Sequence, residues 1–313
     1  MLIAQISDTH ILAPGKLFRA RITTPAPGAD SIHAEIDTGA CLARAVAALN
    51  ALTPSPDITI VTGDLVDHGE PAEYDHLRHL LAPLRMPVFV IAGNHDSRAP
   101  LRQAFGADGY FPPDGFLHYT VEDFPLRLVA LDTLIPGEHG GTLCEERLRW
   151  LDATLAAAPD RPTLVMMHHP PFPTGITYMD EHGLQNIAAL AEIVARHPQV
   201  ERITCGHLHR SIDRRFAGTV AGTAPSTAHQ IQLDLRPGAR LHFRFEPPGY
   251  LLHLWEAESG LVTHTAVFGD WSGAGLEREA AVRRLDEVRH AIGPLDGASS
   301  IADLRRDRDR DTR

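Results

Sequence analysis

The sequence predicts an α/β fold in which two packed sheets are flanked by helices. Up to about residue 209, short apolar runs alternate with amphipathic segments, which is typical of buried strands joined by helices. After that point the pattern changes to short alternating runs separated by turns, and this predicts additional antiparallel strands. The length of 313 residues and the 43% hydrophobic content are sufficient for a large core.

Five short apolar runs are predicted to be buried strands. They lie at residues 2–6, 57–62, 87–92, 163–167 and 200–205. The expected helices span residues 37–51, 70–81, 100–105, 145–157 and 183–196, and a hairpin is expected from 116–122 and 126–131. Asp37 or Thr38 can cap the first helix, and Pro71 suits the first turn of the second.

The remaining segments are predicted from their turn residues and composition. Residues 11–36 contain three prolines and are expected to be irregular and to fold over a functional region, because they are too long for a simple connection. Their basic residues Lys16, Arg19 and Arg21 could reach a substrate phosphate or simply be solvated, and the solvated position is the expected one. Loops are expected at 133–142 and 170–182. The late strands are expected at 212–216, 219–221, 229–235, 240–245, 250–256 and 261–267, followed by a helix at 276–292 and a disordered tail at 303–313.

Composition and charge restrict the class of partner and the compartment. The formal net charge of −11 argues against a surface that binds nucleic-acid polymers or anionic membranes. The three cysteines, Cys41, Cys144 and Cys205, suggest no disulfide framework, which fits a reducing compartment. We find no basic leader and no apolar run of membrane-spanning length. A cytoplasmic location is therefore expected, without a membrane partner.

Each of the five predicted strands is followed by residue types that bind metal ions. The candidate ligands are Asp8, His10, Asp64, Asn94, His168, His207 and His209. In open α/β folds, ligands bind beyond the carboxyl ends of the strands, where all of these residues lie. Taken singly, each has an ordinary explanation as a turn residue or a core histidine. Their joint occurrence at five strand ends predicts a metal site.

The spacing of these residues suits two ions. In an extended Asp-x-His segment, Asp8 and His10 project to the same side and can reach one ion. The carboxylate of Asp64 has two oxygens and can bridge two ions about 4 Å apart. Gly63 allows the chain to turn tightly beneath such a site. The amide oxygen of Asn94 is a neutral ligand that adds no charge.

In this order, the motifs DTH, GDL, GNHD, HHPP and GHLH resemble those of the calcineurin-like metallophosphoesterase superfamily. The resemblance covers about the first 210 residues. The longer matches VTGDLVDHGEPAEY, MHHPPFPTG and GTAPSTAHQ are similar to the class III cyclic-nucleotide phosphodiesterase and glycerophosphodiesterase branch. The resemblance implies a four-layer α/β/β/α sandwich of two mixed sheets flanked by helices, with a dinuclear metal centre.

The resemblance also implies a role for each candidate ligand. One ion would be held by Asp8, His10, Asp64 and His209, and the other by Asp64, Asn94, His168 and His207. His168 and His169 are adjacent, and the family pattern favours His168 as the ligand. His95, beside Asn94, would protonate the leaving alkoxide or orient the phosphate. The alternative is that His95 only makes a supporting hydrogen bond.

The implied activity is hydrolysis of small phosphodiesters by metal-activated hydroxide. The substrates would be 3′,5′- or 2′,3′-cyclic nucleotides or glycerophosphodiesters, and the cofactors two ions of Fe, Mn, Zn or Co. Residues 1–270 would form the catalytic domain, and 271–313 the terminal helix and tail. The late strands at about 211–268 carry apolar residues that could build a homo-oligomer interface or simply complete the second sheet.

Other functions remain open at this point. A phosphomonoesterase or pyrophosphohydrolase would need more cationic side chains near the site than these motifs contain, although Arg210 adjoins His209. A non-catalytic metal-binding scaffold would have lost ligands, and none of the seven is missing. A structural zinc site would not need seven ligands.

The roles of several nearby residues are also open. Asp67 could support His10 or lie in a surface turn. Tyr178, His182 and Phe172 could shape a leaving-group pocket or only pack a loop. The segment containing His229 could border the site or only turn the chain.

Overall fold

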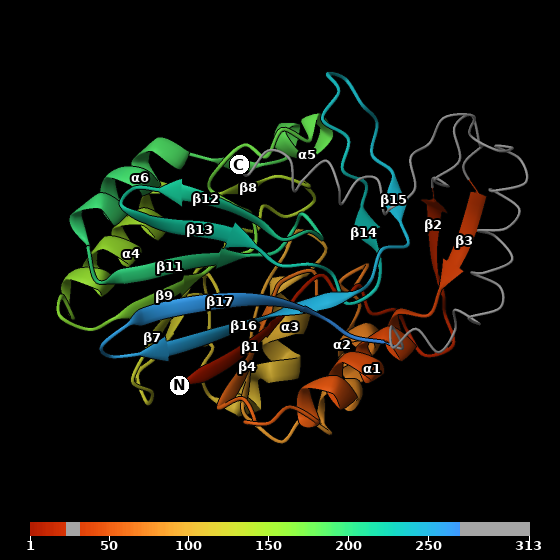
Figure 1. The fold of residues 1–313 in the computed structure, drawn as a ribbon, viewed down its shortest axis with the longest axis horizontal. Coiled ribbons are helices and arrows are strands. Elements are labelled where there is room, and N and C mark those ends of the chain that lie inside the picture. The colour runs from red at the N-terminus through yellow and green to blue at the C-terminus, as the bar shows by residue number, and fades with distance from the viewer. Residues whose placement is uncertain (23–31, 270–313) are drawn as a thin grey trace, which may run out of the picture. The chain divides into compact units, whose positions relative to one another are not determined.

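The computed structural model describes residues 1–22 and 32–269, which build two large mixed sheets, two small sheets and the helices that cover them (Figure 1). The first large sheet has the strand order β17-β16-β1-β4-β5. Its strands β1 (Leu2–Ile6), β4 (Ile58–Thr62) and β5 (Val88–Ile91) are parallel. The late strands β16 (Gly249–Glu256) and β17 (Gly260–Val267) add an antiparallel hairpin beside β1.

The second large sheet is parallel in its centre and antiparallel at both edges. In order, its strands are β12 (Ile212–Phe216), β13 (Thr219–Thr223), β11 (Val200–Cys205), β9 (Thr163–Met166), β7 (Arg127–Ala130) and β6 (Tyr119–Val121). β13 pairs antiparallel to β12, as predicted for the strands after residue 209, but on its other side it pairs parallel to β11, which the sequence did not predict. Because β12 returns along the outer edge, β13 runs in the direction of β11 and fills the place between them.

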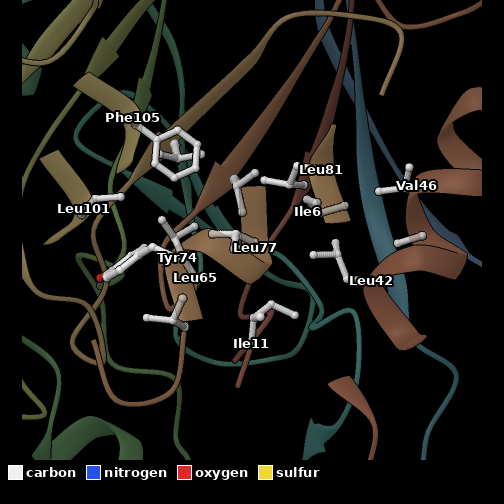
Figure 2. Close-up of a cluster of buried hydrophobic side chains, with 14 of the residues drawn as sticks. Ile6, Ile11, Leu42, Val46, Leu65, Tyr74, Leu77, Leu81, Leu101 and Phe105 are labelled. Carbon is white, nitrogen blue, oxygen red and sulfur yellow. The ribbon is translucent and has the colours of Figure 1, made fainter. Parts of the chain in front are cut away.

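Helices cover the outer face of each large sheet. They are α1 (Thr38–Asn50), α2 (Pro71–Leu81) and α3 (Arg98–Phe105) on the first sheet, and α4 (Glu145–Ala156) and α6 (Ile187–Arg196) on the second. Figure 2 shows Leu42 of α1 and Leu77 of α2 packed towards Ile6. A separate apolar cluster, which includes Ile3, Ile60 and Leu164, fills the space between the sheets. The four-layer α/β/β/α sandwich is therefore confirmed.

Residues that favour helix ends form the predicted caps. The carboxylate of Asp37 accepts a hydrogen bond from the backbone N–H of Ala40 at 2.8 Å. Pro71 occupies the first turn of α2. Several predicted boundaries are wrong, those around residues 170–186 most clearly. Residues 184–185 form a short strand, β10 (Leu184–Gln185), paired with β8 (Gly141–Thr142), and the loop at 170–182 contains α5 (Thr177–Glu181).

The expectation that residues 11–36 are irregular is wrong for two segments. β2 (Phe18–Ile22) and β3 (Ile32–Ile36) form an antiparallel hairpin. They belong to a four-stranded small sheet with β14 (Gln230–Ile231) and β15 (Phe243–Arg244), each much shorter than predicted. The partner strand β15 lies more than two hundred positions along the chain, so no local pattern reveals the pairing.

Residues Met1–Gly269 form one compact unit. The predicted helix at 276–292 and tail at 303–313 lie outside the described residues, as does the side chain of Arg21. Arg19 is solvent-exposed and pairs with Glu35 at 3.1 Å. Within the described residues, no helix is long and apolar enough to cross a membrane.

Candidate metal centre

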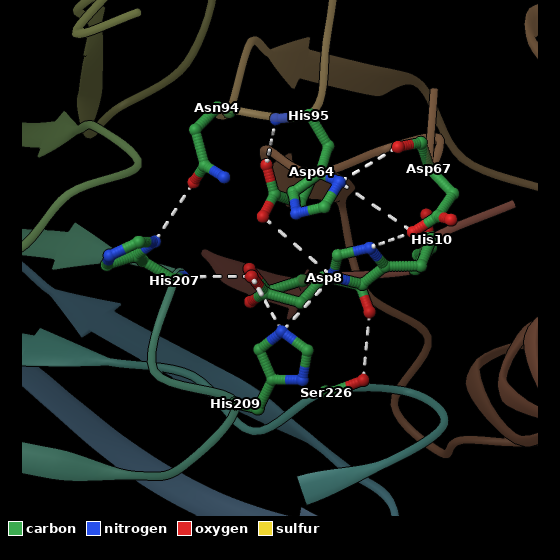
Figure 3. A network of polar contacts seen from close by, with 12 residues as sticks. Asp8, His10, Asp64, Asp67, Asn94, His95, His207, His209 and Ser226 are labelled. Carbon is green, nitrogen blue, oxygen red and sulfur yellow. Dashed lines mark hydrogen bonds and ion pairs between the residues drawn. The ribbon is translucent and has the colours of Figure 1, made fainter. Parts of the chain in front are cut away.

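The structure brings all seven candidate ligands together at the edge where the parallel strands of both large sheets end. Figure 3 shows Asp8, His10, Asp64, Asn94, His207 and His209 at this edge. Four of the seven follow strands of the first sheet and three follow strands of the second. Six are buried, and Asn94 is partly buried. The centre therefore spans the two sheets, and its geometry depends on how the sheets are held together.

One group of donor atoms lies around His10 and His209. The Nε2 atoms of these two rings are 3.1 Å apart. The Nε2 atom of His209 is 3.5 Å from Oδ1 of Asp8, and that of His10 is 3.8 Å from Oδ2 of Asp64. Each of the two imidazole nitrogens thus lies within 3.8 Å of a carboxylate oxygen of a candidate ligand.

A second group lies around Asn94. Its Oδ1 atom is 3.1 Å from Nε2 of His168 and 3.0 Å from Nδ1 of His207. The same Nε2 atom of His168 is 3.3 Å from Oδ2 of Asp64. Oδ2 of Asp64 therefore faces both groups, which is the position that a bridging carboxylate requires.

Hydrogen bonds determine which nitrogen of His10 and His168 faces the centre. Nδ1 of His168 lies 2.8 Å from the carbonyl oxygen of Thr62, which can only accept, so this nitrogen carries the hydrogen. Nδ1 of His10 lies 3.1 Å from Oδ1 of Asp67, a carboxylate that fixes the ring in the same way. In the neutral form of both rings, Nε2 is left with a lone pair directed at the centre. Asp67 thus supports His10.

The remaining two histidines are oriented in the same manner but use different nitrogens. Nδ1 of His209 donates to the carbonyl oxygen of His229 at 2.8 Å, so Nε2 faces the centre. Nε2 of His207 donates to the carbonyl oxygen of His182 at 3.2 Å, so Nδ1 faces the centre. Burial lowers the pKa of both rings, that of His209 to about 3, and both are therefore neutral near pH 7.

The turns that carry the ligands have an unusual backbone. Asp8, His10, Asp64, His207 and His209 all have positive φ, between 44° and 70°. A left-handed conformation costs roughly 1–3 kcal/mol for a residue other than glycine. Such strain persists only where the surrounding structure determines it, and it is concentrated at functional sites. Here it aims side chains from the strand ends into the centre.

Two glycines allow the ligand turns to approach one another. Gly63 has φ +87°, and a side chain there would collide with the His168 ring. A Cβ atom at Gly206 would lie 2.5 Å from the carbonyl oxygen of Thr62. Asn94 lies in a turn but, unlike these five ligands, does not have positive φ.

The charges in the centre act on one another strongly. Burial raises the pKa of Asp8 to about 6, and the neighbouring Asp64 carboxylate adds to the rise. Burial opposes protonation of His168, but the charges of Asp64 and Asp8 outweigh it and raise the pKa of the ring to about 9. Although burial also opposes ionisation of Asp64, the surrounding histidines, His168 foremost, hold its pKa well below the usual value.

The donor set fits metal ions. With both Nδ1 atoms donating outward, the Nε2 lone pairs of His10 and His209 point at each other across 3.1 Å, an arrangement that a proton or a cation must stabilise. Oδ2 of Asp8 is buried without a hydrogen-bond partner among the described residues. Unsatisfied buried lone pairs are unfavourable unless they coordinate a cation.

The sequence model of the calcineurin-like phosphoesterase family matches residues 1–211. The chain belongs to this family. It is 36% identical over 299 residues to the glycerophosphodiester phosphodiesterase GpdQ of Enterobacter lignolyticus (strain SCF1), which covers 92% of this chain and 99% of the relative. It is 33% identical over 232 residues to the 3′,5′-cyclic adenosine monophosphate phosphodiesterase CpdA of Pseudomonas aeruginosa, or 74% and 78% of the two chains.

Solved structures support the fold assignment. A dimetal phosphatase from Danio rerio superposes with a TM-score of 0.58 at 17% identity, covering 86% of this phosphoesterase and 99% of that chain. The resemblance inferred from the motifs is therefore confirmed. The family uses a dinuclear metal site, in keeping with the histidine and aspartate groups found here.

A cavity of about 200 Å³ lies above the candidate centre of this phosphoesterase. Its lining consists of the side chains around the centre and an apolar wall, and among the described residues it contains neither lysine nor arginine. The apolar wall is formed by Phe18, Met179, Ile231, Leu241 and Phe243. Part of this wall comes from the small sheet, so the segment at 11–36 does reach the site through Phe18.

The loop residues Tyr178, His182 and Phe172 have different roles in the structure. Tyr178 and His182 line the cavity, and their rings stack with centroids 4.6 Å apart. Phe172 instead packs in the core between the second sheet and its helices. The loop at 170–182 therefore contributes a cavity wall at its end and ordinary packing at its start.

His95 is held beside the centre, and its side chain is accessible from the cavity, as a proton donor must be. Its backbone N–H donates to Oδ1 of Asp64 at 2.9 Å, which places the residue beside the centre. Its Nδ1 atom lies 2.8 Å from the carbonyl oxygen of Asp67 and therefore carries a hydrogen. The side chain is 30% exposed and lines the cavity.

Two histidines near the phosphoesterase centre are more prominent than the sequence indicated. His229 is fully buried, stacks on Phe18 at 4.3 Å, and has no hydrogen-bond partner on either ring nitrogen among the described residues. It lies with His10 and His209 in one group of potential ligands. His139 lines the cavity from the loop at 133–142. From the sequence, the segment containing His229 could border the site or only turn the chain, and no local signal distinguishes His139.

Proposed function

We propose that this phosphoesterase is a dinuclear metal-dependent phosphodiesterase that hydrolyses small phosphodiesters. The observation that carries the proposal is that one atom, Oδ2 of Asp64, lies near ligand atoms of both groups, 3.8 Å from Nε2 of His10 and 3.3 Å from Nε2 of His168. We assign Asp8, His10, Asp64 and His209 to one ion and Asp64, Asn94, His168 and His207 to the other. His169 is a weaker candidate than His168, because its Nδ1 is bonded to the hydroxyl of Thr133 and its Nε2 to the carbonyl of His139.

The proposed hydrolysis combines the chemistry that bound metal ions would supply with the roles of residues of this chain. Two bound divalent ions would lower the pKa of a water molecule between them and stabilise developing negative charge on the phosphoryl group. Asp8 and Asp64 offset part of the cationic charge, which leaves the site complementary to a singly charged diester. His95, fixed through Nδ1 by Asp67, would present a protonated Nε2 to the leaving oxygen. The apolar wall of the cavity would hold the organic part of the substrate.

Among the described residues, the cavity lining has no lysine or arginine, which supports a diester over a monoester or pyrophosphate substrate. Arg210, which adjoins His209, does not change this conclusion. Its guanidinium donates to the carbonyl of Ile231 and to the carboxylate of Glu246, each at 2.7 Å. The names of the relatives make cyclic nucleotides and glycerophosphodiesters the substrate classes to test.

The donor set consists of nitrogen and oxygen, which suits Fe, Mn, Zn or Co. Cys205 is buried, and burial raises the pKa of its thiol, so it supplies no thiolate ligand. The free state of all three cysteines agrees with the proposed cytoplasmic location. Exposed Val262 and Val267 on β17 support the further proposal that this edge takes part in a homo-oligomer.

Metal uptake is expected to weaken as the pH falls. In the metal-free protein, His168 has a pKa of about 9 and Asp8 of about 6, whereas a ligand must have lost its proton. Protons therefore compete with the metal below pH 9 at His168, and below pH 6 at Asp8 as well. We expect the apparent Mn²⁺ affinity to fall roughly tenfold per pH unit between about pH 8 and 7, with release of about one proton. Calorimetry in buffers of different ionisation enthalpy measures this proton, and an affinity independent of pH would contradict the prediction.

The proposed function is tested with a panel of substrates and metals. The metal-depleted chain is loaded separately with Mn, Fe, Co and Zn and assayed on bis(p-nitrophenyl) phosphate, cyclic AMP, 2′,3′-cyclic AMP and glycerophosphoethanolamine. We expect metal-dependent hydrolysis of the aryl diester and of at least one natural diester. p-Nitrophenyl phosphate is the monoester control. If it is the preferred substrate, or if no diester is hydrolysed, the proposal is wrong.

A further inference from the structure

Polar side chains cross the space between the two large sheets, next to the candidate metal centre. Gln5 of β1, Thr204 of β11 and His253 of β16 are all completely buried. The surrounding inter-sheet cluster is otherwise apolar. Burying an amide and an imidazole is unfavourable unless their polar atoms are hydrogen-bonded, so their presence here requires an explanation.

Gln5 connects the two sheets directly. Its Nε2 group donates to Oγ1 of Thr62 in the first sheet at 2.8 Å and to the carbonyl oxygen of Cys205 in the second at 3.0 Å. Its Oε1 atom accepts from the hydroxyl of Thr204, also in the second sheet. Only one orientation of the amide satisfies these bonds, because a carbonyl oxygen cannot donate.

His253 holds that orientation from the other side. Its Nε2 atom lies 2.9 Å from Oε1 of Gln5 and must donate to it. Its Nδ1 atom lies 2.9 Å from Oγ1 of Thr263 on β17, which then donates to the ring. Burial lowers the pKa of His253 to about 3, so the ring is neutral and has one donor and one acceptor. The amide and the ring thus have one consistent arrangement.

In the first sheet the network ends on residues that precede ligands. The hydroxyl of Thr62 donates to Oγ of Ser7 at 2.8 Å, and Ser7 directly precedes Asp8. The carbonyl oxygen of Thr62 accepts the hydrogen bond that orients His168. Thr62 is also followed by Gly63 and then by Asp64. A displacement of Thr62 would therefore move donor atoms of both half-sites.

In the second sheet the network ends on Cys205, which precedes Gly206 and His207. Its carbonyl oxygen accepts from Gln5 and from the backbone N–H of Ala224. Gln5 therefore ties the turn that carries His207 to the strand β1 that leads to Asp8. The bond spans the sheets next to the point where their ligands meet.

We propose that Gln5 and His253 are positioning residues that set the spacing of the two half-sites, an inference that rests on the dinuclear metal centre of the proposed function. Neither side chain is itself a ligand or touches substrate. Gln5 bridges the sheets, and His253 fixes the Gln5 amide. The late hairpin β16–β17 thus contributes to the centre through His253 and Thr263, although its strands follow every ligand in the sequence.

The test measures metal binding without substrate. Mn²⁺ is titrated calorimetrically into the metal-depleted full chain of the wild type and of Gln5→Met and His253→Leu, which remove the network with little change in volume. We expect both substitutions to weaken Mn²⁺ binding about 10- to 100-fold, the usual range for residues that orient metal ligands. His253→Gln retains a donor and is expected to recover most of the affinity.

Ile58→Ala is the matched control for general loss of stability. Ile58 is fully buried in the same inter-sheet cluster, but it starts β4, at the opposite end from Asp64. We expect this variant to lower the melting temperature of the metal-depleted chain while leaving Mn²⁺ affinity within about twofold of wild type. The two variants are compared at an equal loss of melting temperature. If Gln5→Met then binds Mn²⁺ as tightly as Ile58→Ala does, the network only stabilises the fold and the inference is wrong.

Two further outcomes separate the inference from the proposed function. If Gln5→Met yields no folded protein, Mn²⁺ binding is measured in Thr204→Val instead, because this substitution removes one hydroxyl of the network at nearly constant volume. Unchanged Mn²⁺ affinity in Thr204→Val overturns the inference. A wild-type chain that binds Mn²⁺ but hydrolyses no diester overturns the proposed function and leaves the metal-binding test intact. A wild-type chain that takes up no metal overturns both.

Discussion

Replacing Asp64 with alanine is expected to lower kcat/KM on any phosphodiester by at least about 10³-fold, because two ions would lose their shared carboxylate and the several kcal/mol of charge stabilisation that they supply. Oδ2 of Asp64 lies between the two groups of ligand atoms, and its Oδ1 accepts from the backbone of His95. Elemental analysis should find fewer than two ions per chain in this variant.

Two further variants test whether the loss of activity in Asp64→Ala is due to the loss of the bridging carboxylate. Asp64→Asn keeps an oxygen for the His95 backbone but removes the charge and weakens the bridge, so we expect partial metal loading and intermediate activity. Asp75→Ala makes the same deletion on the exposed face of α2 and should leave activity unchanged. Full metal content and activity in Asp64→Ala would exclude a dinuclear mechanism that depends on this bridge.

Replacing His95 with alanine is expected to lower kcat about 10²- to 10⁴-fold on substrates with alkoxide leaving groups, because the protonated ring would no longer supply a proton to the leaving oxygen. The loss should be much smaller on bis(p-nitrophenyl) phosphate, because p-nitrophenolate leaves without protonation. The measurement is kcat for cyclic AMP or glycerophosphoethanolamine beside kcat for the aryl diester, with metal content verified for each preparation.

His139→Ala is the matched control, because His139 lines the same cavity but is exposed and is not adjacent to a proposed ligand. We expect it to change activity on both kinds of substrate by a similar, small factor. An equal loss on both substrates in His95→Ala would mean that His95 orients the phosphate or supports Asp64 rather than acting as an acid.

Local patterns in the sequence predicted the central part of this fold accurately. β1 and β11 have the predicted boundaries, and β4, β5 and β9 differ by one or two residues. Buried parallel strands are nearly continuous apolar runs, so they can be recognised without knowledge of their partners. The ligand residue types could also be predicted, because all seven lie within four residues of the end of such a run.

The small sheet could not be predicted in the same way. β14 and β15 contain two residues each, and β15 pairs with β2 through a single register position, Phe243 with Ile22. Strands this short have no recognisable period. They are ordered by contacts with a segment more than two hundred residues away, and those contacts also place Phe18 and Phe243 in the cavity wall.

The sequence alone predicts which side chains gather at the shared edge of the sheets, because strand direction and residue type are local properties. Only the folded chain determines the orientation of these side chains, including which ring nitrogen each histidine presents to the centre. The nitrogen that His10 and His207 present to the centre depends on Asp67 and on the carbonyl of His182, which are remote in the chain. The spacing of the half-sites depends on contacts between distant strands, and hydrogen-bond direction and backbone strain arise only when those strands pack together.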